Sequence, residues 1–378
     1  FNAVTLSGAS TFDSSASTVN IGGAVTGGGF ALTMNVTGTT SAIAGVISNI
    51  SSLTSGGAGT LTLSNANLYT TTTNINAGTL VITNASALGT STATVAISAA
   101  TLQINGNGFT LPYVMNINNG GAIVDNGSSS TTTLNGLITL SAAGSSTETI
   151  NVVNSGQILS IASLTGGNAI SGNLIKSGNG TLLLPGANSH IGTFTINAGS
   201  VDIRNNLSLG TTNVALNNAS LITAGGSNLV IANNIAFGGT SNTFDIGAGT
   251  TLTFNGILSG NTIFVKSGSG VLTIGGVSAN TFSGTTTING GTLNIAKTSA
   301  LGGGAVTVNN TGTLGVIGTA LTLSNILTLN TGSAIIDTNA NGRNTFSGAI
   351  SLSGTNTVTV GSPSGVLTLA GAISGSTT

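Results

Sequence analysis

Short runs in which apolar residues alternate with small polar ones return along the whole chain, and Gly or Asn closes each run. Clear examples are VLTI at 271–274, TLNI at 292–295 and AVTV at 305–308. A period of two places successive side chains on opposite faces of a β-strand, and Thr, Val and Ile favour strands. Glu, Lys, Arg and Gln, which favour helices, are rare. The pattern therefore predicts an all-β fold with almost no helix.

The starts of the expected strands recur at a nearly constant spacing. In the last third of the chain they fall, about 19 residues apart on average, at Gly270, Gly291, Gly312, Gly332, Gly348 and Gly365. A strand of four residues cannot bury its apolar face alone, so successive turns must stack and pair through their backbones. We therefore predict a single-stranded, right-handed parallel β-helix with about 19–20 residues per turn and about 20 turns.

A longer repeat is superimposed on this spacing. The segments GTLTL, GTLLL, GVLTI and GVLTL are equivalent and lie at 59–63, 180–184, 270–274 and 365–369. No linker and no change of composition interrupts the series. We therefore predict that residues 1–378 form one continuous β-helix of about four imperfect repeats of roughly 90–121 residues each, without a separate second domain.

The composition excludes several classes of function. Charged residues make up 3% of the chain and the net charge is −1, so no basic patch could neutralise nucleic-acid phosphates. No apolar run approaches the roughly 20 residues that span a bilayer as a helix, and we predict no membrane span. Cys is absent, which excludes a disulfide framework. Because the chain begins with Phe1 and not Met, we expect either a mature segment or a fragment, with targeting information in the missing ends.

Three stretches share a more detailed motif of a Lys, a Gly-rich strand, an Asn two residues before an aromatic residue, and a second Gly-led strand. The fullest copy is KSGSGVLTIGGVSANTFSGTTTINGGTL at 266–293. The copy at 176–201 has His190 at the aromatic position, and the copy at 58–80 keeps Tyr69 but lacks the Lys. These residues resemble the autotransporter-associated β-strand repeat.

The resemblance implies a right-handed β-helix passenger on the outside of a Gram-negative-type cell. Such passengers are usually adhesins or surface spacers, so a host-cell or other surface receptor is an implied partner. The motif is specific for architecture and says little about function.

Four aspartates are the best-repeated charged residues: Asp13, Asp125, Asp245 and Asp337. They suggest either a calcium or carbohydrate site, or corner residues that accept backbone N–H bonds. Hard cations require six to eight oxygen ligands, usually with several carboxylates, whereas each Asp here stands alone. We therefore predict a structural role and no metal site.

The remaining ionisable residues suggest little chemistry. Lys176 and Lys266 precede the same strand in two copies of the motif. They could contact an anionic partner, but we predict that they are exposed residues inherited with the repeat. Asp202 and Arg204 lie two residues apart and are predicted to form a surface ion pair.

Glu148 is the only Glu and His190 the only His. Acid–base catalysis requires a positioned pair in tuned environments, and six acidic residues over the whole chain make an enzyme improbable. We predict no catalytic residue, no cofactor-binding residue and no cofactor.

Two further patterns concern the surface. Runs of Thr at 70–73, 131–133 and 285–287 raise the possibility of ice binding, which would need Thr-x-Thr on every turn in one register. Asn-x-Ser/Thr triplets at Asn35, Asn84 and Asn206 could accept glycans, although a chain rich in these residues produces such triplets by chance.

Three hypotheses about function follow. The first is an extracellular, non-catalytic structural or adhesive β-helix. The second is the subunit of a self-assembling filament, sheath or surface layer, because an almost uncharged surface offers little repulsion and open solenoid ends favour end-to-end self-association. The third, an enzyme on a β-helix, would need a cleft with clustered ionisable groups.

Overall fold

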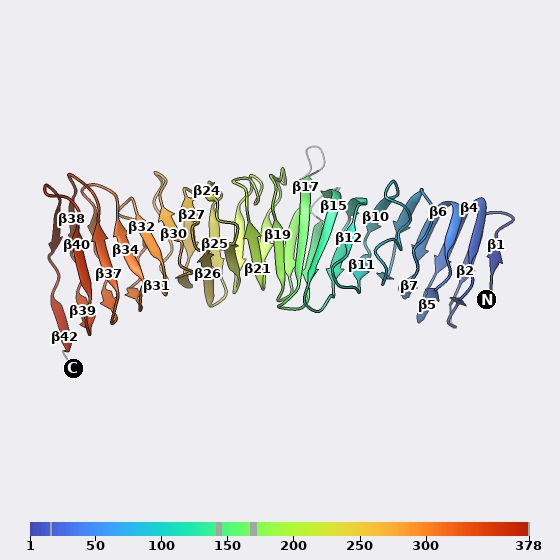
Figure 1. The fold of residues 1–378 in the computed structure, drawn as a ribbon, viewed down its shortest axis with the longest axis horizontal. Coiled ribbons are helices and arrows are strands. Elements are labelled where there is room, and N and C mark those ends of the chain that lie inside the picture. Colours follow the sequence, from blue (N-terminus) through green and yellow to red (C-terminus); the bar gives the residue numbers. More distant parts are fainter. Residues whose placement is uncertain (16, 141–145, 167–171, 377–378) are drawn as a thin grey trace. The chain divides into compact units, whose positions relative to one another are not determined.

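The fold is described by a computed structural model for residues 1–15, 17–140, 146–166 and 172–376. The chain divides into two compact units, Phe1–Thr195 and Ile196–Thr378, which we call unit 1 and unit 2 (Figure 1). Within the described ranges every regular element is a strand and no α-helix occurs. The predicted all-β class is confirmed.

Unit 1 contains two series of strands, and strands within each series pair in parallel across successive turns. The first series consists of β1 (Val4–Thr5), β2 (Ser10–Asp13), β4 (Val25–Asn35), β6 (Ile47–Gly56), β8 (Thr72–Ile75), β10 (Thr94–Ser98), β12 (Thr110–Leu111), β13 (Val114–Asn118), β15 (Thr131–Leu140), β17 (Ile158–Gly166) and β19 (Thr181–Leu184). The second consists of β3 (Asn20–Ile21), β5 (Thr40–Ile43), β7 (Thr60–Leu63), β9 (Thr79–Ile82), β11 (Thr101–Ile104), β14 (Ala122–Asp125), β16 (Thr147–Val152) and β18 (Asn173–Ser177). Strand β20 (Phe194–Ile196) lies where unit 1 ends and unit 2 begins.

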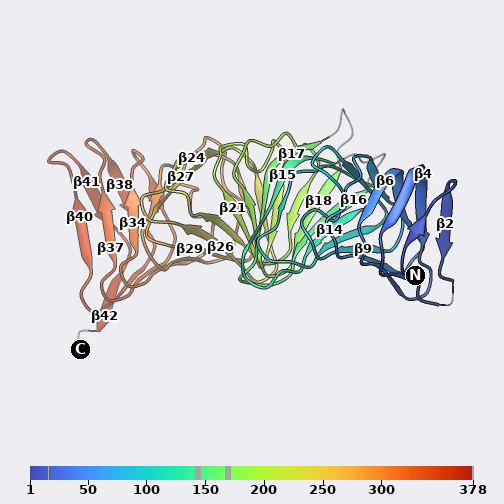
Figure 2. The same cartoon turned by 45° about the vertical axis from the view of Figure 1, so that its right-hand side comes forward.

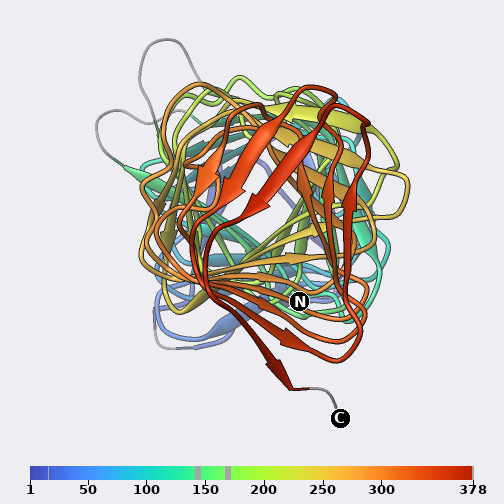
Figure 3. The same cartoon turned by 90° about the vertical axis from the view of Figure 1, so that its left-hand side faces the viewer.

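Unit 2 has the same parallel pairing, in four series of strands. The longest consists of β21 (Ser200–Ile203), β23 (Ser220–Thr223), β26 (Ser241–Ile246), β29 (Ile263–Ser267), β31 (Thr286–Ile288), β33 (Val306–Val308), β36 (Leu327–Leu329), β39 (Ile350–Ser353) and β42 (Ile373–Ser376). The next consists of β24 (Asn228–Ile231), β27 (Thr251–Phe254), β30 (Val271–Ile274), β32 (Thr292–Ile295), β34 (Thr313–Val316), β37 (Ala334–Asp337) and β40 (Thr357–Val360). The two short series are β22 (Val214–Asn217), β25 (Ile235–Gly238) and β28 (Leu258–Gly260), and β35 (Thr322–Leu323), β38 (Arg343–Phe346) and β41 (Val366–Leu369). In the end-on view the last strands of unit 2, drawn in red, run along different sides of one coil (Figure 3).

The parallel β-solenoid is confirmed, but its turns are longer and fewer than predicted. Register partners are 19 residues apart at Thr60 and Thr79 and 27 apart at Ala122 and Thr149, and the solenoid has about 16 turns rather than about 20. The predicted number of turns was too high because the short Gly spacing near the C-terminus was counted as a full turn. Gly332 precedes β37 and Gly348 precedes β39, and these strands belong to different series. That interval therefore spans part of one turn.

Alternation along each strand separates the core from the surface. In β5, β7, β9 and β11 the pairing stacks Ile43, Leu63, Ile82 and Ile104 on successive turns, and all four side chains are buried. Burial of each such side chain contributes about 1.5–3 kcal/mol. The outward positions of the same strands carry Thr40, Thr60, Thr79 and Thr101.

The core of unit 2 contains a cluster of aromatic rings that is absent from the described part of unit 1. Phe237, Phe244, Phe264 and Phe282 lie with neighbouring ring centroids 5.2–6.0 Å apart, and Phe254 packs 5.9 Å from Phe244. Mostly edge-to-face, these pairs each add about 0.5–1.5 kcal/mol beyond the area they bury.

The described residues include no helix that is long and apolar enough to cross a membrane. The prediction of one continuous domain over residues 1–378 stays a prediction.

Candidate functional site

The lysine of the repeat motif is an internal hydrogen-bond donor. Lys266 lies in β29, where it is in register with Phe244 and Ile288, and its side chain is fully buried. Its Nζ donates to the carbonyl oxygens of Ser267 at 2.6 Å, Gly268 at 2.8 Å and Gly290 at 3.1 Å. The ammonium thus joins the corner of its own turn to the corner of the next one.

The corresponding lysine of unit 1 is placed in the same way. Lys176 in β18 is fully buried and donates to the carbonyl oxygens of Ser177 at 2.8 Å and Gly178 at 2.9 Å. Burial lowers the pKa of Lys176 and Lys266 to about 8, so both amines remain largely protonated at neutral pH. The predicted exposure of these lysines is wrong. Their phase shows why, because in IFVKS the buried Phe264 and Lys266 are two residues apart and so share one face.

The asparagine of the motif connects three turns. Asn280 accepts the backbone N–H of Leu258 at 3.0 Å through Oδ1 and donates from Nδ2 to the Ala300 carbonyl at 3.0 Å. Asn67 does the same in unit 1, between the Ile47 N–H at 2.8 Å and the Ala87 carbonyl at 2.6 Å. A buried side-chain amide therefore replaces strand pairing at this corner.

The aromatic residue of the motif enters the core two positions later. In unit 1 the hydroxyl of Tyr69 lies 2.8 Å from Thr73 Oγ1, and burial raises the pKa of Tyr69. In unit 2 the corresponding pair is Phe282 and Thr286. Because Phe lacks a hydroxyl, the buried Oγ1 of Thr286 has no hydrogen-bond partner.

The four aspartates are not equivalent. Asp125 and Asp337 end their strands in inward phase and are fully buried, whereas Asp13 and Asp245 are exposed. Asp245 is in register with the outward Ile222, whereas Asp337 is in register with the buried Val316. A shift of one residue moves a side chain to the other face of a strand. The recurrence of Asp in the sequence therefore grouped buried positions with exposed ones.

The buried aspartates have neutral partners. Asp125 accepts from Gln157 Nε2 at 2.7 Å and from the Gly127 N–H at 3.2 Å. Burial raises the pKa of Asp125 and these hydrogen bonds oppose the rise. Asp337 accepts from Asn344 Nδ2 at 2.9 Å and the Asn339 N–H at 3.1 Å. These contacts fit the structural role predicted for corner aspartates. In the part of the chain that the structure covers, no three potential metal ligands come together.

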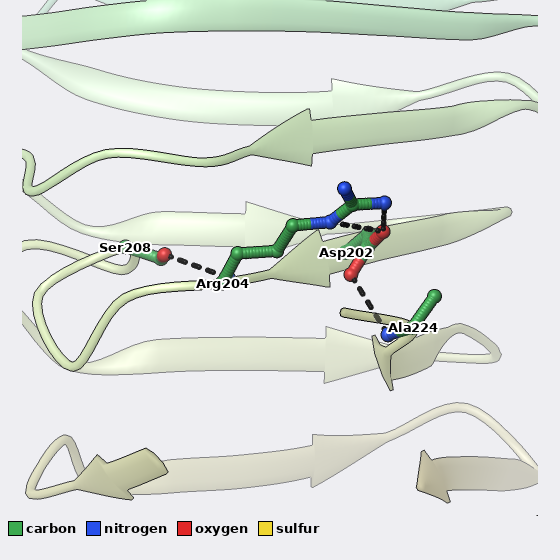
Figure 4. A network of polar contacts seen from close by, with 4 residues as sticks. All are labelled: Asp202, Arg204, Ser208 and Ala224. Atoms are coloured by element: carbon green, nitrogen blue, oxygen red, sulfur yellow. Dashed lines mark hydrogen bonds and ion pairs between the residues drawn. The ribbon is translucent and has the colours of Figure 1, made fainter. Parts of the chain in front are cut away.

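The predicted pair Asp202–Arg204 forms in unit 2 (Figure 4). Arg204 donates to Asp202 Oδ2 from its terminal guanidinium nitrogen at 2.9 Å and from Nε at 3.2 Å. Asp202 Oδ1 also accepts the Ala224 N–H at 3.3 Å. The aspartate side chain is 5% exposed and that of Arg204 41%, so the pair joins the core to the surface and is not fully superficial.

Glu148 and His190, which the sequence places 42 residues apart, both lie inside unit 1 and have separate hydrogen-bond partners. Both side chains are buried. Ser146 Oγ donates to Glu148 Oε1 at 2.8 Å, and His190 Nε2 lies 2.7 Å from the Gly172 carbonyl oxygen. Burial lowers the pKa of His190, and the Gly172 carbonyl and the charge of Glu148 oppose this effect. The isolated positions of the two residues in the sequence gave no sign that both side chains would be buried.

Surface candidates contribute less. Each of the three Thr runs places one residue in the core, namely Thr73, Thr132 and Thr286, so the runs are not flat outward arrays. Asn35 donates to Asp13 at 3.0 Å and Asn206 Oδ1 accepts the Val230 N–H at 2.8 Å. Glycosylation of the Asn-x-Ser/Thr triplets stays a prediction.

Two shallow depressions lie beside the Leu-Gly turns of the repeats. The one in unit 1 has a volume of about 330 Å³ and includes Leu68, Pro112 and Tyr113 in its lining. The one in unit 2 has a volume of about 220 Å³ and includes Leu207 and Val230. No carboxylate, amine or imidazole lines either depression, so their chemistry is limited to neutral contacts.

The geometry defines a parallel β-solenoid repeat protein in which the motif residues are interior ones. Comparison with protein families shows which repeat it is. Residues 53–82, 174–203 and 264–295 each match the passenger-associated-transport-repeat. The chain therefore contains three copies of this repeat. No curated protein and no solved structure matches the chain.

Proposed function

We propose that this chain is an extracellular, non-catalytic β-solenoid that acts as an adhesive or spacer element on a Gram-negative bacterium. The repeat and the solenoid fit a passenger-like surface protein. One observation supports the non-catalytic part most directly. The lysine and asparagine that recur in the repeats are used inside the coil, where they bind backbone groups.

The outer face supports contact through neutral groups. Thr287, Thr307 and Thr328 occupy one outward column on β31, β33 and β36, and Ser351 continues it on β39. Turns stack about 4.8 Å apart, so such columns present closely spaced hydroxyl and methyl groups. Adhesion through this surface should depend on hydrogen bonds and apolar contact and respond weakly to salt, unlike contacts between exposed charges.

Attachment of coated beads to cultured animal cells tests the adhesive role. Beads that carry the 378-residue chain should attach above the level of albumin-coated beads, equally at low and at moderately raised salt. Replacement of Thr287, Thr307 and Thr328 by Lys tests that column, and Thr251→Lys with Thr273→Lys on β27 and β30 is the matched control on another face. Attachment no greater than that of albumin would remove the adhesive role and leave the spacer.

Self-assembly is a second candidate, because charged residues make up only 3% of the chain, which leaves little repulsion between copies, and because apolar side chains are exposed on the turn that contains β40, β41 and β42. All four residues of β40 are exposed, and Val358, Val366 and Ile373 are 47%, 42% and 52% exposed. The strands of this turn are seen in Figure 2. Exposed apolar side chains of this kind can pack against a second copy.

Electron microscopy over a range of protein concentrations tests this candidate. End-to-end assembly predicts filaments that lengthen with concentration and disappear in Val358→Lys/Val366→Lys, because a charge buried in such a contact is costly. Thr251→Lys is the control. Discrete particles at every concentration would count against assembly.

A further inference from the structure

Unit 1 buries two further ionisable side chains: His190, at the aromatic position of the second motif copy, and Glu148, outside the motif. Glu148 lies in β16, in register with Leu174 of β18. The N–H of Leu174 donates at 2.8 Å to the carbonyl of Thr193, three residues beyond His190. Strand β18 therefore lies between β16 and the turn that carries His190, so Glu148 and His190 are buried two turns apart in unit 1.

Each residue leaves one polar atom without a partner. Glu148 Oε1 accepts from Ser146, but the buried Oε2 has no hydrogen bond. A carbonyl oxygen can only accept, so the 2.7 Å contact with Gly172 requires a hydrogen on His190 Nε2. In the neutral ring Nδ1 is then an acceptor, and it too is buried and unpartnered. A proton added at Nδ1 would therefore place a charge in the interior without a hydrogen-bond partner for its new N–H.

The other nearby charges are occupied elsewhere. Lys176 also lies in β18, but its ammonium binds the carbonyls of Ser177 and Gly178. Asp125 on the preceding strand β14 is bound by Gln157. Among the residues that the structure describes, Glu148 is the charge that acts on the imidazole. The two side chains do not form an ion pair within 4.0 Å, since the only such contact in the described ranges is Asp202–Arg204.

We propose that His190, buried with Nε2 bound to the Gly172 carbonyl and with Nδ1 unpartnered, weakens the folded state of unit 1 when the pH falls below about 6.5, and that the charge of Glu148 limits this loss. The proposal goes beyond the surface role and does not depend on it. It makes unit 1 an acid-sensitive part of the solenoid.

The sign follows from proton linkage. In the unfolded chain the imidazole has a pKa near 6.5, and in unit 1 burial lowers the pKa of His190. The unfolded state therefore binds more protons between these two values. The stabilisation is complete above about pH 6.5 and is lost as the pH falls toward the lowered pKa of His190. Over this range the folding equilibrium constant decreases by at most about tenfold per pH unit. The charge of Glu148 opposes the fall in the pKa of His190 and so limits the loss.

The presence of a single His makes a direct test possible. In protein labelled with ¹³C-histidine, one imidazole signal reports the titration of His190 by NMR. We expect a midpoint below that of a model peptide, and a further fall of about 0.5 pH unit or more in Glu148→Gln, because the favourable charge is removed. Asp245→Asn, which changes an exposed carboxylate of unit 2, is the control and should leave the midpoint unchanged.

Hydrogen exchange supplies the second measurement. His190→Phe places at this position the residue that the third copy has at Phe282. After correction for the intrinsic rates, β16 and β18 should exchange several-fold faster at pH 5.5 than at pH 7.5 in the native chain but not in His190→Phe. If the NMR titration shows that His190 stays neutral down to low pH, the proposal still requires this difference in exchange between the native chain and His190→Phe.

Three results would overturn the proposal. They are a midpoint equal to that of the model peptide, a midpoint unaffected by Glu148→Gln, and the same pH dependence of exchange in the native chain and in His190→Phe. Should His190→Phe fail to fold, Glu148→Gln provides the exchange comparison, because loss of the carboxylate should deepen the acid-dependent weakening.

Discussion

The copies of the repeat in unit 1 and unit 2 fill the same interior positions with different chemistry. At the aromatic position, residues 53–82 have Tyr69, whose hydroxyl binds Thr73. Residues 264–295 have Phe282 within a phenylalanine cluster, and the hydroxyl of Thr286 stays unpartnered. The coil thus accepts either a paired hydroxyl or additional ring packing at one position. The comparison shows that backbone pairing defines the turn, while the side chains inside it can be exchanged as sets.

The same contrast holds at the lysine position. Lys266 binds three carbonyl oxygens in unit 2, whereas the position 121 residues before Lys176 is Ser55, which is small and buried. A corner of the solenoid can therefore be held by a buried ammonium or closed without one. Removal of one member of such a set should therefore lower the free energy of unfolding more than replacement of the whole set by the one found in another copy.

The largest effect is expected for Lys266→Met, which keeps the length of the side chain and removes its charge. Three carbonyl groups of half-buried corner residues would lose their charged donor, at a cost of about 3 kcal/mol in the free energy of unfolding. Hydrogen exchange in β29 and β31 reports this locally, which suits a stacked-repeat protein whose turns open in part.

Two controls calibrate this result. Lys297→Met, at a partly exposed lysine, should change stability by less than about 0.5 kcal/mol. Ser55→Ala should cost under about 1 kcal/mol, because Ser55 makes no equivalent clamp. A cost for Lys266→Met as small as that of Lys297→Met would show that the ammonium contributes nothing net.

A smaller effect is expected from exchange of the aromatic residues. Tyr69→Phe leaves the buried hydroxyl of Thr73 without a partner and should destabilise unit 1 by about 1 kcal/mol. Phe282→Tyr supplies Thr286 with a partner and should stabilise unit 2 by up to about 1 kcal/mol. Urea unfolding followed by exchange in β8 and β31 measures both.

The Thr286→Val background separates the hydroxyl pair from ring packing. In this background Phe282→Tyr should lose its benefit, because the new hydroxyl has no partner. An equal gain with and without Thr286 would show that the tyrosine acts by filling space, and the proposed parallel with Tyr69 would then fail.

Much of the architecture could be predicted because it depends on a local pattern. Alternation in VLTI and TLNI gives the strands, and their recurrence gives a parallel solenoid. The turn count was less accessible, because Gly332 and Gly348 precede strands of different series that the same Gly-apolar signal marks alike.

The interior polar residues were harder to predict. A lone Lys is rarely buried, and this general rule outweighed the phase of Lys266 relative to Phe264. Burial depends on carbonyl groups from two corners, which only the coil brings together. The burial of Glu148 and His190 in one unit likewise depends on the length of the intervening turns, which the sequence pattern does not give.

The smallest expected effect concerns the buried and exposed aspartates. Burial raises the pKa of Asp125, so the folded state binds its proton more tightly than the unfolded chain, whose carboxyl has a pKa near 3.9. The contribution of Asp125 is therefore most favourable below about pH 3.9 and is lost as the pH rises through the raised value. Asp125→Asn removes this dependence.

Exchange in β14 between pH 3 and pH 7, corrected for intrinsic rates, should show this slope in the native chain and a flatter one in Asp125→Asn. Asp13→Asn, at an exposed carboxyl of the same unit, should retain the native slope. The hydrogen bonds from Gln157 and Gly127 oppose the effect of burial, so the slope is expected to be modest. A slope of opposite sign would mean that these donors outweigh burial and that Asp125 stabilises unit 1 as an anion. The interior of the solenoid would then stabilise a carboxylate as well as the buried ammonium groups of Lys176 and Lys266.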